Sequence, residues 1–269
     1  RRYGGNTSCV VLDVPGGEPI LFDLGTGLRF YGVAEPCTEV PFRGTALLSH
    51  LHWDHVQGLP FFPPLHCQGS RLDVYGPGED GRSLEDSFDA FMNPPFFPIC
   101  IRDLPGQITF HDATSGSFDV GPARVTVGEV PHVGATFGYR VDWEGVSVAY
   151  VSDHQQPVDD PRRVVDSVLE LVDGVDLLIH DAQFTPEEFA ERPDWGHCTV
   201  DYALEVAHQA TAGELVLFHH DPAHCDGTID GLLAAATDRA VGLDVGSVSA
   251  AAEGRTVHLS PTSAPAARS

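Results

Sequence analysis

Four side chains that commonly bind metal ions lie within the six residues 50–55, which read HLHWDH. They follow a short apolar run at residues 46–49 that is typical of a strand. Because side chains alternate along a strand, His50 and His52 should point the same way, and the next turn can bring Asp54 and His55 to a neighbouring point. One zinc ion does not need so many ligands so close together, so the pattern favours two adjacent divalent ions.

The composition restricts the kinds of partner. The 269 residues carry 39 acidic and 15 basic side chains, a formal net charge of −24, and contain no lysine. A surface this acidic repels polyanions, so we expect a small-molecule substrate and disfavour a nucleic-acid polymer. No apolar run approaches the 18 or so residues of a membrane span, and the first twenty residues do not form a signal peptide.

The six cysteines form no C-x-x-C pair, and a chain of this length does not need disulfides as its framework. We therefore expect reduced thiols and a cytoplasmic location. Cys225 lies close to several histidines, but a buried or idle thiol is the simpler interpretation.

The elements that must position these groups differ between the two halves of the chain. The first half indicates short strands with glycine and proline turns, and the second half alternates strands with helices. The predicted strands are 8–14, 20–23, 46–49, 72–75, 124–130, 136–141, 146–151, 175–179 and 215–218, and the predicted helices are 83–92, 161–172, 200–210 and 227–240. We expect one domain over residues 1–259 and a frayed tail at 260–269. The aromatic, proline-rich segment 79–106 is either a peripheral helix on the core or a lid over the site.

The motif at residues 50–55 resembles the signature of the metallo-β-lactamase superfamily. The segments YGGNTSC (residues 3–9), DLGTG (residues 23–27) and residues 49–58 are similar to the branch that contains phosphoribosyl cyclic phosphate phosphodiesterases and tRNase Z. This resemblance covers most of residues 3–225. It implies an α/β (α+β) fold, a four-layer αββα sandwich with the metals along one edge of the sheets, and it leaves a homodimer open.

The resemblance also implies three further ligands, each just after a predicted strand. They are His132, Asp153 and His219. By this correspondence one ion is held by His50, His52 and His132 and the other by Asp54, His55 and His219, with Asp153 between them. His220 competes with His219, which we prefer because it directly follows the apolar strand. Since all the ligands are nitrogen or oxygen, zinc is the default metal, with manganese or iron as alternatives.

A second group of residues, in two further motifs, restricts the class of reaction. The sequence WGHCT (residues 195–199) begins a predicted helix, and HDAQ (residues 180–183) ends a predicted strand. They are similar to the His-x-Thr and His-Glu-Ala-Thr elements of tRNase Z-like phosphodiesterases, with Asp181 and Gln183 replacing Glu and Thr. This implies that His197, oriented by Asp181, acts with Asp54 in catalysis. The structural alternative is that His197 or Thr199 caps the helix and Asp181 only supports it.

The preferred interpretation is a dinuclear metal-dependent hydrolase, a phosphodiesterase for a small phosphodiester, with cyclic phosphodiesters among the candidates. One alternative is a lactone or thioester hydrolase of the same fold, because the same seven ligands serve that chemistry. The other is a non-catalytic metal-binding or regulatory protein. Two departures bear on the choice: relatives begin with one more strand and a Gly-Ser loop, and tRNase Z carries a long basic arm that this sequence lacks.

Overall fold

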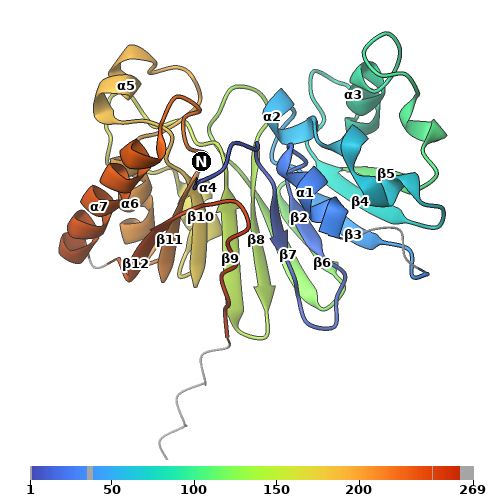
Figure 1. Ribbon diagram of the computed structural model, residues 1–269. Helices are drawn as coiled ribbons and strands as arrows, with labels where there is room; N and C mark the ends of the chain where they lie inside the picture. The colour runs from blue at the N-terminus through green and yellow to red at the C-terminus, as the bar shows by residue number, and fades with distance from the viewer. Residues whose placement is uncertain (1, 35–38, 244, 261–269) are drawn as a thin grey trace, which may run out of the picture.

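Two β-sheets face each other in the computed structural model, which describes residues 2–34, 39–243 and 245–260 (Figure 1). The first sheet has the order β1-β2-β3-β4-β5 and the second the order β12-β11-β10-β9-β8-β7-β6. The strands of the first sheet are β1 Val10–Leu12, β2 Ile20–Phe22, β3 Arg43–Leu47, β4 Arg71–Gly76 and β5 Gln107–Asp112. Those of the second are β6 Gly116–Val120, β7 Ala123–Glu129, β8 Phe137–Trp143, β9 Val146–Val151, β10 Leu177–Asp181, β11 Glu214–Phe218 and β12 Ser247–Ala250.

Helices cover the outer faces of both sheets (Figure 1). On the first sheet lie α1 Gly27–Ala34, α2 Trp53–Val56 and α3 Leu84–Phe91, with the 3-10 helices η1 Leu59–Phe61, η2 Pro63–His66 and η3 Ile101–Asp103. On the side of the second sheet lie α4 Asp166–Val172, α5 Pro186–Glu191, α6 Val200–Gln209 and α7 Asp226–Leu243. The predicted four-layer αββα arrangement is confirmed.

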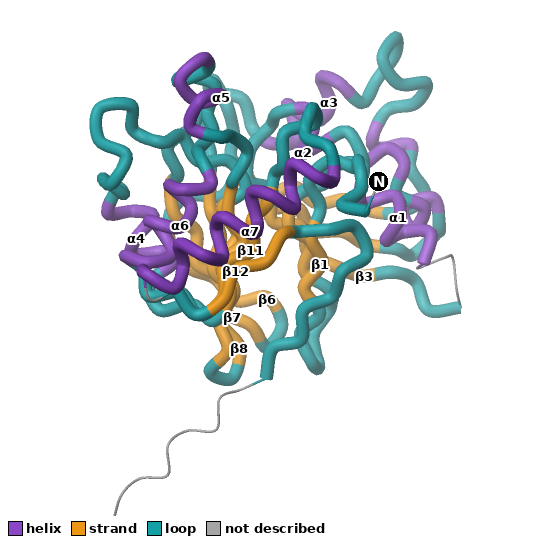
Figure 2. Tube along the Cα trace, turned by 60° about the vertical axis from the view of Figure 1, so that its left-hand side comes forward, coloured by secondary structure: helices purple, strands orange, loops and turns teal. Residues whose placement is uncertain are grey.

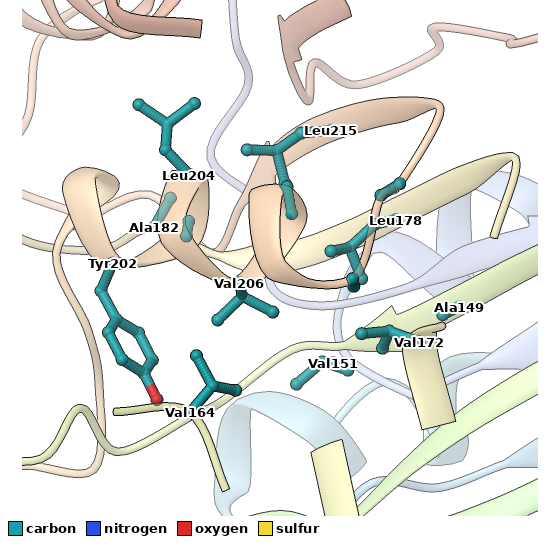
Figure 3. Close-up of a cluster of buried hydrophobic side chains, with 14 of the residues drawn as sticks. Ala149, Val151, Val164, Val172, Leu178, Ala182, Tyr202, Leu204, Val206 and Leu215 are labelled. Atoms are coloured by element: carbon teal, nitrogen blue, oxygen red, sulfur yellow. The ribbon is translucent and has the colours of Figure 1, made fainter. Parts of the chain in front are cut away.

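Apolar side chains fill the three spaces between these layers. Phe22, Tyr139 and Tyr150 are fully buried between the two sheets. Figure 3 shows the layer between the second sheet and its helices, where Leu178 and Leu215 meet Val206 of α6. Each such valine or leucine contributes about 1.5–3 kcal/mol on burial, so these layers hold the strands that carry the site.

Parallel pairing places the carboxyl ends of several strands at one edge of the molecule. Strands β2, β3, β4 and β5 are parallel neighbours, as are β9, β10, β11 and β12. Both views show α2, α3 and α5 at this same end of the sheets (Figures 1 and 2). Loops that leave these strand ends therefore converge, as ligand sites of parallel sheets commonly do.

Several predicted elements have the expected position. The hairpin around Pro15 pairs β1 with β2, and the turn at 142–145 joins β8 to β9. Ser83 caps α3 by accepting a hydrogen bond from the Asp86 amide. The role of segment 79–106 as a lid stays a prediction, as does the single domain over residues 1–259, and most of the predicted tail lies outside the described residues.

Other elements differ from the prediction. Helix α4 begins at Asp166 instead of residue 161, because Asp160 accepts hydrogen bonds from the amides of Arg162 and Arg163 and forms a turn there. Strands β5, β6 and β12 were not predicted. They are edge strands and only partly buried, and each shows its apolar alternation over just two apolar side chains, as in QITF of β5 and FDV of β6.

The expectation of reduced thiols is wrong for Cys67, which is disulfide-bonded, whereas Cys9, Cys100, Cys198 and Cys225 are free. Spacing along the chain does not show which thiols meet in space, so a pair distant in sequence escapes that analysis. Within the described ranges, no helix combines the length and the apolar character that crossing a membrane requires.

Candidate metal centre

The chain enters the site from β3 through a buried network around Asp23. The Asp23 carboxylate accepts hydrogen bonds from the Ser49 amide at 2.7 Å and the Ser49 hydroxyl at 2.9 Å. It also accepts one from the Tyr150 hydroxyl at 2.7 Å and lies 2.7 Å from Nδ1 of His55. A buried carboxylate with four partners is well satisfied, and it fixes the backbone of Ser49 before His50 and the imidazole ring of His55 after it.

Three of the predicted ligands form a first set, which we call group A: His50, His52 and His132. Their ligand atoms and one of Asp153 all lie within 4.8 Å of one another. Nε2 of His132 is 3.2 Å from Nδ1 of His52. His50 and His52 come from the loop between β3 and α2, and His132 comes from the loop after β7.

The other three form group B: Asp54, His55 and His219. Nε2 of His219 lies 3.1 Å from the Asp54 carboxylate, and Nε2 of His55 lies 3.3 Å from it. His219 directly follows β11 and has a φ of 55°, a left-handed conformation that few side chains adopt without a cost. Strain of this kind often occurs at functional sites, where the surrounding structure enforces it.

Asp153 lies between the two groups and offers one oxygen to each. Its Oδ2 is 3.7 Å from Nε2 of His50 and 3.7 Å from Nε2 of His132. Its Oδ1 is 3.2 Å from Nε2 of His55 and 3.6 Å from Nε2 of His219. This is the placement that a carboxylate bridging two cations requires.

The donor atoms fit a pair of divalent cations. Nε2 of His50, Nε2 of His55 and Oδ1 of Asp153 are buried and have no hydrogen-bond partner within the described ranges. In four of the histidines, Nδ1 lies within hydrogen-bond distance of a neighbouring oxygen, which we call its support. The supports are Ser49 Oγ for His50, Asp23 for His55, the Gly196 carbonyl for His132 and Gln183 Oε1 for His219. Such supports leave Nε2 as the lone-pair donor, as metal-binding histidines need.

The electrostatic field of the site also favours positive charge. Burial lowers the pKa of His55, but Asp153 and Asp23 outweigh burial and hold that pKa well above its usual range. Burial likewise opposes the shift at His219, where Asp153 and Asp54 raise the pKa to about 9. Burial raises the pKa of Asp153, yet His219 and His55 bring it well below its usual range. The carboxylates thus attract cationic groups into a buried space, where a metal ion would meet the same attraction.

His197 and Asp181 also meet beside this cluster. Nδ1 of His197 lies 3.0 Å from Oδ2 of Asp181 and 3.6 Å from Oδ2 of Asp153. The amides of His154 and Gln183 donate to the Asp181 carboxylate at 3.1 and 3.0 Å and fix its orientation. Thr199 caps α6 by accepting a hydrogen bond from the Tyr202 amide, so the capping alternative holds for Thr199 and not for His197.

The competing histidines have other partners. His220 lies 3.2 Å from the Ala251 carbonyl, and His224 lies 2.9 Å from Glu188, so neither joins a group. His154 and His180 are fully buried and lie 3.0 Å apart beneath the Asp181 loop. Sequence analysis did not identify Asp23, Ser49 or Gly196 as supports. The available signals were the motif segments that contain them: DLGTG for Asp23, residues 49–58 for Ser49 and WGHCT for Gly196.

Comparisons with known proteins show which family the chain resembles. Residues 20–220 match the family model described as a beta-lactamase superfamily domain. A curated Ribonuclease Z from Natronomonas pharaonis is 29% identical over an aligned length of 259. The alignment covers 80% of this chain and 81% of the relative. Human tRNase Z, short form, is 25% identical with a TM-score of 0.58 over 82% of this chain and 89% of that one. The metallo-beta-lactamase fold protein YhfI from Bacillus subtilis, at 21% identity, shares the fold with a TM-score of 0.70 over 94% of each chain.

These relatives overturn one expectation from composition. A small-molecule substrate was expected and a nucleic-acid polymer disfavoured, yet curated relatives from several organisms carry the name Ribonuclease Z. Net charge sums the whole surface, whereas binding depends on the local field near the site. Cations at the centre would dominate that local field, so an overall charge of −24 does not exclude a polyanion.

The resemblance inferred from the motifs is confirmed, because the matched residues 20–220 contain both groups, Asp153 and the His197–Asp181 pair. The chain therefore belongs to the beta-lactamase superfamily and is a metal-dependent hydrolase with the metallo-β-lactamase fold.

Proposed function

We propose that this protein is a two-metal phosphodiesterase that hydrolyses phosphodiester bonds of RNA. The observation that carries the proposal is the contact between His197 and Asp181 at 3.0 Å, next to the bridging position of Asp153. Lactone and thioester hydrolysis need the metal ligands but not this pair. The name Ribonuclease Z of the relatives supports the same reaction class and substrate.

Seven residues would hold the ions: group A, group B and the bridging Asp153. Zinc suits this nitrogen and oxygen donor set, as do manganese and iron. When bound, two such ions lower the pKa of water and neutralise charge on a phosphate.

The chain's own residues then handle the leaving group. Asp181 accepts the hydrogen bond from Nδ1 of His197, which fixes the orientation of the ring. Nε2 of His197 is left to donate a proton to the departing oxygen. The imidazole ring stacks on that of His219 at 5.1 Å, which keeps it next to group B.

The test is an assay of metal-loaded protein on two phosphodiesters, with a chelated sample as control. The substrates are bis-(p-nitrophenyl) phosphate and a short RNA duplex with a 3′ extension. We expect cleavage of both, lost on chelation, with RNA cleavage further dependent on His197. Turnover of a lactone or thioester by a preparation that cleaves neither phosphodiester would contradict the proposal.

A further inference from the structure

A cavity of about 480 Å³ lies beside the segment that carries group B. It is lined by Asn6, Thr26, Arg29, Phe30, Gly58 and Phe61. These residues come from the N-terminal loop, from α1 and the turn before it, and from η1 and the glycine that precedes it.

The wall of this cavity is joined to the metal centre through the backbone. The Gly58 amide donates to the Leu24 carbonyl, and the Leu24 amide donates to the His55 carbonyl at 2.7 Å. A Cβ at Gly25 would lie only 2.3 Å from the Asp54 carbonyl oxygen. The turn that begins α1 is therefore packed directly on the backbone of Asp54 and His55, so the cavity lining is a direct neighbour of the segment that carries group B.

Two phenyl rings form the apolar part of the lining. Phe30 is 61% exposed and Phe61 is 55% exposed, so both offer ring surface to a ligand. The polar part includes Asn6, whose amide nitrogen donates to Glu253 and whose side-chain oxygen has no hydrogen bond among the described residues. Aromatic faces that stack on a planar ring, with an amide to contact its edge, are the features that bind nucleobases without strict sequence preference.

Arg29 adds a positive charge to this lining. Ion pairs engage eight other arginines, whereas the Arg29 guanidinium forms neither an ion pair nor a hydrogen bond with any part of the chain that the structure describes. The backbone amide of Arg29 donates to the Thr26 carbonyl. In a protein of net charge −24, an arginine without an acidic partner is available to an anion. Its guanidinium matches the geometry of a phosphate group.

A second cavity, which His132 of group A lines, has a different chemistry. It measures about 290 Å³ and is lined by His132 together with valines, prolines and two glutamines, with Asp194 as its acidic group. Gln155 and Gln156 are already hydrogen-bonded within the chain. A phosphate meets no cationic side chain there, so charge complementarity favours the Arg29 cavity.

We propose that the cavity between α1 and η1 binds one nucleotide of the substrate next to the cleaved bond. The base lies against Phe30 and Phe61, and its phosphate pairs with Arg29. This proposal rests on the proposed phosphodiesterase function and assigns the side of the centre on which the nucleotide lies.

The experiment measures calorimetric binding of adenosine 5′-monophosphate and of inorganic phosphate to the metal-loaded protein. We expect Arg29→Gln and Phe61→Ala each to raise the Kd of the nucleotide about 10-fold, since a phosphate pair and a stacked base are each of that order. Phe61→Tyr should retain binding. Arg102→Gln is the matched control, because Arg102 is also exposed but lies in η3, outside the cavity lining.

Equal nucleotide affinity in the wild type and in Arg29→Gln would overturn the subsite, as would an equal loss in Arg102→Gln. If Phe61→Ala binds the nucleotide with unchanged affinity while Arg29→Gln no longer binds phosphate, the cavity binds phosphate alone. That outcome would contradict the proposal that it binds a nucleotide. Hydrolysis of bis-(p-nitrophenyl) phosphate by the wild type tests the proposed function separately. If the protein cleaves this diester but fails the binding tests, the proposed subsite is wrong and the proposed phosphodiesterase function is supported.

Discussion

Groups A and B have the same number of ligands but different supports. In group A, His132 is held by the Gly196 carbonyl and His50 by the Ser49 hydroxyl, both of which are neutral. In group B, His55 is backed by the buried carboxylate of Asp23, and Asp54 adds a second carboxylate as a ligand. A carboxylate behind an imidazole raises its basicity as a ligand. The ligand geometry of group A therefore depends on close backbone packing, whereas that of group B depends on buried charge.

The largest effect should come from Asp153, the residue that both groups share. Asp153→Asn removes the charge between the two sets of imidazoles, so we expect loss of bound metal and a fall in phosphodiester hydrolysis of about 10⁴-fold or more. Metal ions contribute several kcal/mol to such reactions, and about 1.4 kcal/mol corresponds to tenfold. Elemental analysis and initial rates measure both. Asp238→Asn, on the exposed surface of α7, is the matched control and should keep its metal. An Asp153→Asn variant with full metal content would contradict the bridging position.

A substitution at His197 tests catalysis without removing a metal ligand of group A or group B. His197→Ala should keep the metal content and lower cleavage of an RNA diester by about 100-fold or more, because general acid catalysis supplies roughly that factor. The loss should be smaller for bis-(p-nitrophenyl) phosphate, since nitrophenolate leaves without a proton. Equal losses on both substrates would argue against proton donation by His197.

Group A is best disturbed through the glycine that packs on it. Gly196 has a φ of 89°, and a Cβ there would lie 2.2 Å from the His132 ring. We expect Gly196→Ala to displace His132 and weaken binding of one metal equivalent by about 100-fold, the upper end for residues that support a ligand. Titration with a chromophoric chelator measures this loss. Gly231→Ala in α7, where nothing lies near the added carbon, should bind metal normally.

Group B should respond more weakly to loss of a neutral support. Gln183→Leu removes the acceptor at 2.8 Å from Nδ1 of His219, while Asp54, His55 and Asp23 remain. The expected result is about a 10-fold loss of affinity for one equivalent, the lower end of the same range. Gln209→Leu, at the end of α6, is the control. A larger loss here than in Gly196→Ala would reverse the ranking of the two groups.

Much of the site could be predicted because its ligands follow strands whose apolar runs are visible in the sequence. His132, Asp153 and His219 each come just after such a run, and the structure brings all three to the cluster. Supports such as Gly196 could not be predicted, since a backbone carbonyl leaves no mark on residue type. The partly exposed edge strands β5, β6 and β12 were missed for a different reason, because each shows the strand alternation over only two apolar side chains, which is a weak signal in the sequence.

The sequence by itself determined which residues can bind metal, since the cluster at 50–55 and the elements around it follow from residue type and period. Only the tertiary structure decided that Asp153 offers one oxygen to each group and that His197 faces Asp181. The physical reason is range. Periodicity reports a few neighbouring residues, whereas parallel pairing of β9, β10 and β11 brings side chains more than sixty residues apart to the same edge.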